Sequence, residues 1–167
     1  MITDIHIYTD CGINNKKQKE RDFHYGIGNL VVKYQGLKSE EFIFSQYTNF
    51  GIIQEEAQKI KPNHNSTKTK DKKGICVGEM YAIVKGLSHI QEDVDCKITI
   101  YTDNLHCVQV LNGITKTFSP TIDRLKSIFH VLVGNKNVEV MWIPGHQGTW
   151  GNEIVDKLAT KAKKSNI

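Results

Sequence analysis

The chain has 167 residues, about the length of one domain. Hydrophobic residues make up 39% and charged residues 24% of it, a balance typical of globular proteins and not of disordered chains. The net charge of +4 is a weak indication of an anionic partner. No apolar run approaches the length of a membrane span, and the N-terminus lacks a signal-peptide pattern, so we expect an intracellular, cytoplasmic protein without membrane contact.

Three strand-like segments come first in the chain. Residues 2–10 are apolar enough for a strand that is buried on both faces. Residues 23–34 and 41–49 read as two further strands, joined by a hairpin at 35–38. The pattern therefore predicts an antiparallel meander of three strands.

The next segment, residues 52–75, does not belong to the predicted strands. Residues 52–61 are predicted as a short helix that Pro62 stops, and residues 63–74 as a polar, lysine-rich loop. We therefore predict a single domain over 1–167 with a lysine-rich insertion at about 52–75. A helix is predicted over 78–90 with Glu79 at its start, on the face that packs against the sheet.

The second half alternates strands and helices. Strands are predicted at 97–102 and 138–143, and helices at 104–112, 120–133 and 152–163. Leu105, Val108 and Leu111 should face inward from the first of these helices, and Ile122, Leu125, Ile128, Phe129 and Leu132 from the second. Strands separated by helices should run parallel to the first strand, so we expect a mixed α/β sheet. The four cysteines show no zinc-like spacing and should be reduced.

Four acids and one histidine stand where elements begin or end. Asp10 and Asp103 each follow a Tyr-Thr pair at the end of a predicted strand, and Glu79 and Asp156 lie on predicted helices. His146 follows Gly145 in a polar loop before the last helix. Taken in pairs, these acids could be ordinary turn formers or helix N-terminal residues. Their joint occurrence favours one site at the carboxyl ends of neighbouring strands.

Several carboxylates held close together repel one another unless cations neutralise them. Oxygen ligands without cysteine or histidine suit Mg²⁺, with Mn²⁺ as a substitute. Two such ions roughly 4 Å apart can activate a water molecule and stabilise a leaving oxygen in phosphodiester cleavage. The residue pattern thus predicts a nuclease-type metal centre.

The motifs resemble those of the type 1 ribonuclease H family. They are T-D at the first strand, G-E-M-x-A-I at the helix with Glu79, Y-T-D-N at the fourth strand, and G-H-Q-G-x-x-G-N-E-x-V-D-K-L-A near the C-terminus. The match follows nearly the whole chain in order, and the last motif is most similar to archaeal-type and reverse transcriptase-associated members. The resemblance implies a ribonuclease H fold: a five-stranded mixed sheet, its first three strands antiparallel and its last two parallel to the first, with helices on both faces.

The resemblance also implies a function and roles. The chain would be an endonuclease that hydrolyses the RNA strand of RNA·DNA hybrids to 5′-phosphate and 3′-hydroxyl ends. Asp10, Glu79, Asp103 and Asp156 would hold two Mg²⁺ ions, and His146 would assist proton movement or product release. We expect a monomer.

Three features depart from the family pattern. Asp10 is followed by Cys11-Gly12, residues 75–78 lack the asparagines that many members use, and 113–119 contains no basic protrusion. The insertion would replace that protrusion through its lysines. The candidate substrate-binding residues are Lys68, Lys70, Lys72, Lys73, Asn104 and Asn152.

Two alternatives remain open at the level of the sequence. A nuclease of the same fold could act on duplex RNA or duplex DNA, because one metal core serves several substrates. A non-catalytic hybrid-binding module is the other alternative, although such a module has no need for four carboxylates.

Overall fold

The computed structural model describes residues 2–13, 25–35, 52–60, 72–116, 119–145 and 150–164. Within these ranges the elements are β1 Ile2–Ile13, β2 Tyr25–Gln35, β3 Ile52–Ile60, α2 Lys72–Ser88, β4 Lys97–Thr102, α3 Leu105–Leu111, α4 Pro120–Val133, β5 Val138–Trp142 and α5 Trp150–Lys164. No helix among them is long and apolar enough to cross a membrane.

The strands form one five-stranded mixed sheet in the order β3-β2-β1-β4-β5. β1 pairs antiparallel with β2, and β2 pairs antiparallel with β3. On the other side of β1, β4 and then β5 add in parallel. The predicted strand directions are therefore confirmed, and β1 lies at the centre of the sheet.

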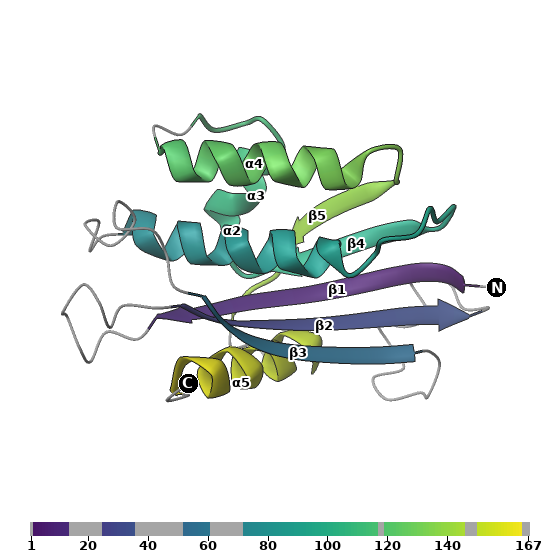
Figure 1. Ribbon diagram of the computed structural model, residues 1–167, viewed down its shortest axis with the longest axis horizontal. Coiled ribbons are helices and arrows are strands. Elements are labelled where there is room, and N and C mark those ends of the chain that lie inside the picture. The colour runs from purple at the N-terminus through teal and green to yellow at the C-terminus, as the bar shows by residue number, and fades with distance from the viewer. Residues whose placement is uncertain are drawn as a thin grey trace.

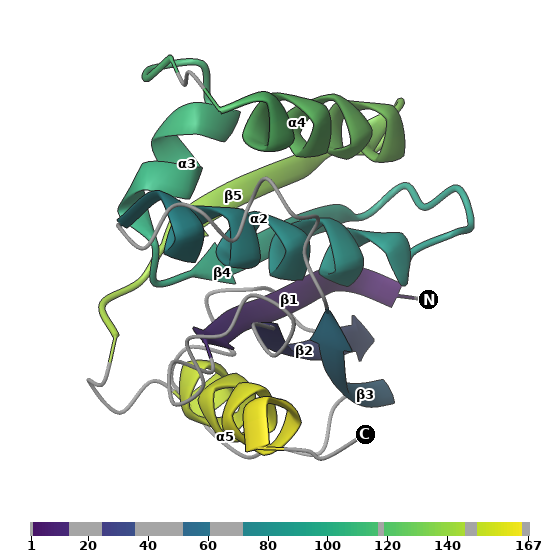
Figure 2. The same ribbon diagram turned by 60° about the vertical axis from the view of Figure 1, so that its left-hand side comes forward.

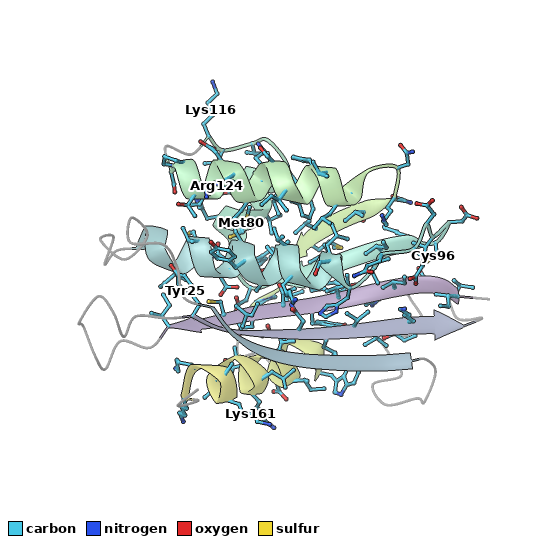
Figure 3. All side chains as sticks on the ribbon, viewed as in Figure 1. Tyr25, Met80, Cys96, Lys116, Arg124 and Lys161 are labelled. Atoms are coloured by element: carbon cyan, nitrogen blue, oxygen red, sulfur yellow. The ribbon has the colours of Figure 1, made fainter. Side chains whose placement is uncertain are left out.

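Helices cover both faces of this sheet (Figure 1). α2, α3 and α4 lie over one face, and α5 packs against the other, below β1 and β2. A large buried cluster fills the first interface, with Ile5, Ile7 and Ile100 from the sheet and Met80 and Ile83 from α2. The smaller cluster between the sheet and α5 contains Tyr8, Leu30, Val32 and Tyr34 of the sheet and Val155 of α5. Figure 3 shows side chains filling both layers.

The third strand differs from the prediction. Residues 52–60, predicted as a helix, form β3, while the predicted strand 41–49 and the hairpin turn after Gln35 lie outside the described residues. The segment I-I-Q-E-E-A-Q-K-I has good helix formers at its centre, so the helix prediction followed local propensity. Pairing along β2, from Tyr25↔Ile60 to Lys33↔Ile52, overrides that propensity.

The helix that carries Glu79 begins six residues earlier than predicted. α2 starts at Lys72, so Glu79 lies in its third turn and not at its N-terminus. The lysine-rich loop was predicted over 63–74, and its last three residues belong to α2. Residues 61–71 are outside the described ranges, so the insertion stays a prediction there.

The predicted inward faces of α3 and α4 are correct except at two residues. Leu105 is 48% exposed and Ile128 is 41% exposed, whereas Val108, Leu111, Ile122 and others of the two sets are buried. Leu105 is the first residue of α3, and Cys107 is buried in the core two residues later. All four cysteines are free thiols, as expected.

Candidate functional site

The sheet register places Asp10 and Asp103 side by side. The last pair of the parallel ladder between β1 and β4 is Tyr8↔Tyr101. Each aspartate lies two residues beyond that pair, so both side chains leave the same face of the sheet. Thr9 Oγ1 donates a hydrogen bond of 3.2 Å to the carbonyl oxygen of Tyr101, which joins β1 to β4 between the ladder and the aspartates.

β1 does not end at Asp10, contrary to the prediction. It continues to Ile13, and Asp10 pairs with Gly28 of β2. The aspartate is therefore held by antiparallel pairing on one side while its other side is open beyond the end of β4. This pairing fixes the backbone of Asp10 more firmly than a strand-end turn would.

Glu79 reaches the cluster because α2 lies very close to the sheet at Gly78. A Cβ atom at Gly78 would be 2.4 Å from Cys11 Sγ and 2.6 Å from the Tyr25 ring. Such distances do not occur in real packing, so the absence of a side chain permits this approach. The next residue, Glu79, is thereby buried against β1 with 4% of its surface exposed.

Asp156 approaches Asp10 from the opposite face of the sheet, again through close packing at a glycine. A Cβ atom at Gly28 would be 2.4 Å from the carbonyl oxygen of Val155, so α5 touches β2 at the residue that pairs with Asp10. Asp156 follows Val155, and it is close enough to Asp10 to add to the raised pKa of that carboxyl, after burial and Asp103. In Figure 2, α5 and α2 lie on opposite sides of β1, so these two acids approach Asp10 from different layers.

Three of the four acids form a compact group of potential metal ligands. One carboxylate oxygen from each of Asp10, Glu79 and Asp103 lies within 4.8 Å of the other two. Burial, and then the charge of Asp103, raises the pKa of Asp10 to about 8. Burial, and then the charges of Asp10 and Asp103, raises the pKa of Glu79 well above its ordinary value. Without a cation, the folded protein therefore disfavours the fully ionised cluster.

The donor set fits a divalent metal ion. Glu79 Oε2 is buried and has no hydrogen-bond partner among the described residues, a costly state for a carboxylate oxygen. The group contains carboxylate oxygens alone, which is the chemistry that hard cations such as Mg²⁺ prefer. A cation at this point would neutralise the repulsion and satisfy the buried oxygen.

The segment that follows β5 wraps around Asp103. The amide of Ile143 donates to the carbonyl oxygen of Thr102 at 2.9 Å, and Trp142 Nε1 donates to that of Asp103 at 3.1 Å. A Cβ atom at Gly145 would lie 3.1 Å from Asp103 Oδ2. His146 comes next and is outside the described residues, so its predicted role is not tested. Gly145, the last described residue before it, lies beside the cluster.

The residues predicted to contact substrate lie in different places, and none of these predicted contacts is tested. Asn104 is the N-cap of α3: its Oδ1 accepts from the amide of Cys107 at 3.0 Å, and its Nδ2 donates to Cys76 Sγ at 3.9 Å. Asn152 is buried in α5, with 4% exposed. Asn104 thus caps α3, and the proposed contacts of both asparagines with substrate stay predictions. Lys68 and Lys70 are outside the described residues, while Lys72 and Lys73 open α2.

Sequence reasoning missed Gly28, Gly78 and Trp142. Each of them acts through a partner distant in the chain, so no local motif marks it. The glycine in G-E-M was visible, but its reason, the close approach of Cys11 and Tyr25, is a tertiary contact.

Solved structures share this fold. The N-terminal RNase H domain of a Mycobacterium tuberculosis protein has a TM-score of 0.66 and 17% identity, covering 96% of this chain and 94% of that one. LC11-RNase H1 in complex with an RNA/DNA hybrid has a TM-score of 0.63 and 19% identity, covering 95% and 98%. RNase H1 from Halobacterium salinarum has a TM-score of 0.60 and 18% identity, covering 95% and 96%.

Curated proteins match over part of the chain. Ribonuclease HI of Haemophilus ducreyi is 33% identical over 95 residues, 48% of this chain and 59% of that protein. Ribonuclease H of Methylobacillus flagellatus is 30% identical over 95 residues, 50% of this chain and 61% of that protein. These alignments thus span about six tenths of the relatives' length. The family model described as RNase H, in contrast, matches residues 3–164. This chain therefore belongs to the ribonuclease H family.

Proposed function

We propose that this protein is a metal-dependent endonuclease that hydrolyses the RNA strand of RNA·DNA hybrids, leaving 5′-phosphate and 3′-hydroxyl ends. The observation that carries the proposal is the group of three carboxylates formed by buried Asp10, buried Glu79 and half-buried Asp103 at the end of the β1–β4 ladder. Membership of the ribonuclease H family supports it, as does a structural neighbour that was solved in complex with an RNA/DNA hybrid.

The four carboxylates are proposed to hold two Mg²⁺ ions. Asp10 is the acid that interacts with all the others: it lies close to Glu79 and Asp103, and Asp156 is one of the groups that raise its pKa. The metal ions would activate the attacking water and stabilise the leaving oxygen. Carboxylates that become fully ionised only when cations are bound are suited to reversible metal binding near neutral pH.

The scaffold contributes rigidity to this proposed centre. Asp10 is held by the pairing of β1 with β2, and on either side of the sheet a helix packs closely next to it, α2 at Gly78 and α5 at Gly28. Ligands whose positions are set by packed backbone lose little freedom when a substrate phosphate arrives. His146, which follows Gly145 beside Asp103, is proposed to assist proton movement or product release.

The deciding experiment offers three substrates side by side in Mg²⁺: an RNA·DNA hybrid, duplex RNA and duplex DNA of one sequence. We expect cleavage of the RNA strand of the hybrid alone. Faster cleavage of either duplex would instead assign the protein to another nuclease class, and a bound but uncut hybrid would make it a binding module.

Asp103→Asn tests the assignment of the site. This substitution keeps the shape of the side chain and removes one charge that faces Asp10 and Glu79. Metal ions contribute several kcal/mol to such reactions, and each 1.36 kcal/mol is tenfold in rate, so we expect a loss of roughly 10³-fold. Asp93→Asn, at an exposed aspartate between α2 and β4, is the matched control.

A further inference from the structure

Trp142, the last residue of β5, is half exposed although its side chain leaves the same face of the strand as core residues do. Side chains alternate along a strand, so Val138, Val140 and Trp142 share the face that is covered by α3 and α4. Val140 is 7% exposed on that face, whereas Trp142 is 45% exposed. The indole therefore extends the apolar stripe of β5 beyond the region that the helices cover.

The exposed indole is tied to the carboxylate cluster. Its Nε1 donates to the backbone carbonyl oxygen of Asp103 at 3.1 Å, and Trp142 also pairs with Thr102 in the sheet. Since the carbonyl and the carboxylate of Asp103 belong to one residue, the edge of the indole lies next to the residue that contributes one of the three clustered carboxylates. Leu105, two residues after Asp103, is 48% exposed at the same end of the sheet.

We propose that the exposed face of Trp142 is a substrate subsite, which holds the sugar of a nucleotide one or two positions from the phosphate that is cut. The inference rests on the proposed function, because the carboxylate cluster must hold that phosphate. It adds a binding residue that neither the family motifs nor the carboxylate chemistry points to.

The chemistry of a duplex favours a sugar as the occupant. In a hybrid the bases are stacked and paired, so the groups that the protein can reach along one strand are phosphates and sugars. A sugar presents a face of C–H groups, which packs against an aromatic ring by dispersion and burial of apolar surface. The hydrogen bond to Asp103 holds the indole in place beforehand, so little side-chain freedom is lost on binding.

A purely structural role for Trp142 makes a different prediction. If the indole only fastens the turn at Asp103, the N–H donor is the important group, and its loss would reduce kcat by displacing a metal ligand. If the ring holds a sugar, the aromatic face is the important group, and its loss would raise KM. Trp142→Phe removes the donor and keeps an aromatic ring, while Trp142→Ala removes both.

The experiment measures kcat and KM for hybrid cleavage in Mg²⁺ with the wild type, Trp142→Ala, Trp142→Phe and the control Trp150→Phe. Trp150 packs edge-on against Tyr8 at 6.3 Å, on the α5 side of the sheet. We expect Trp142→Ala to raise KM roughly tenfold with kcat within about threefold, and Trp142→Phe to recover most of the lost affinity. A fall in kcat of equal size in both Trp142 variants would overturn the subsite and assign a structural role instead.

Fluorescence supplies a second readout. The chain has two tryptophans, so Trp150→Phe leaves Trp142 as the single indole. In the Asp10→Asn, Trp150→Phe protein, which should bind without cutting, added hybrid should change the emission of Trp142 over the same concentration range as binding. Binding without any change in emission refutes the subsite. A wild type that neither binds nor cuts hybrid refutes the proposed function instead, so the two failures are distinguishable.

Discussion

Asp10→Asn should make the metal-free protein more stable at pH 8 and should flatten its stability as a function of pH. Asn has the shape of the protonated carboxyl and cannot ionise. The substitution therefore removes the charge that the folded state tolerates least, at a residue that is 5% exposed between three other acids.

The magnitude follows from the pKa of Asp10, which burial and Asp103 raise to about 8 in the folded protein. In the unfolded chain an aspartate has a pKa near 3.9. Between these two values the folded state keeps its proton while the unfolded state loses it, so the contribution of Asp10 to stability falls as pH rises, by about 1.4 kcal/mol per pH unit. This contribution is fully present below about pH 4 and lost by about pH 8. From pH 5 to pH 8 the loss is on the order of 4 kcal/mol, or roughly 10 °C in Tm for a chain of this size.

The assay is thermal unfolding, followed by circular dichroism, at several pH values from 5 to 9 with a chelator and constant salt. The quantity of interest is the Tm of Asp10→Asn minus that of the wild type, because the pH effects of carboxyls outside the cluster cancel in it. This difference should grow with pH up to about 8. Asp93→Asn, at an exposed aspartate, should show a difference that does not change with pH. Added Mg²⁺ should stabilise the wild type at pH 8 far more than Asp10→Asn.

A Tm difference that stays constant from pH 5 to pH 8 would refute the reasoning. It would mean that the folded protein already pairs the charge of Asp10 with a group other than a metal ion. Equal stabilisation of both proteins by Mg²⁺ would show that the ion binds elsewhere.

Three further predictions concern proton transfer, substrate electrostatics and packing. His146→Ala should lose on the order of 10²-fold in kcat, far less than Asp103→Asn, and should leave the Mg²⁺ dependence of the rate unchanged; a parallel loss of metal affinity would make His146 a ligand. Replacing Lys68, Lys70, Lys72 and Lys73 with Gln should weaken hybrid binding and make the slope of log affinity against log salt shallower by about two to four, with kcat unchanged, whereas an unchanged slope would remove these lysines from the interface. Gly26→Ala should lower the free energy of unfolding by roughly 3 kcal/mol, since its Cβ would lie 2.3 Å from the Ala159 carbonyl oxygen and the Lys163 amide. At Gly113 φ is +74° and an added Cβ would have no neighbouring atom within 4 Å, so Gly113→Ala should lower the free energy of unfolding by only about 1 kcal/mol. Equal losses of stability at the two glycines would contradict the packing argument.

Local patterns in the sequence predicted the elements whose residues bury one face. α4 has the predicted bounds, and β4 does as well, because period-3.6 and strand-like runs are properties of contiguous residues. The acids could also be located in advance: Asp10 lies within β1 and Asp103 directly after β4, at corresponding positions of one parallel pair, and the register brings them together. The positions of these acids in the sequence therefore predicted the group of potential metal ligands that Asp10, Glu79 and Asp103 form.

Tertiary structure decided the remainder. Residues 52–60 have helix-forming side chains at their centre. They form β3 because their backbone pairs along the edge of β2. The position of Glu79 depends on Gly78 meeting Cys11 and Tyr25, and that of Asp156 on Gly28 meeting Val155. Partners so far apart in the chain leave no periodic signal. The raised pKa of Asp10 has the same origin, since burial and a facing carboxylate exist only once β1, β4 and α2 have packed together.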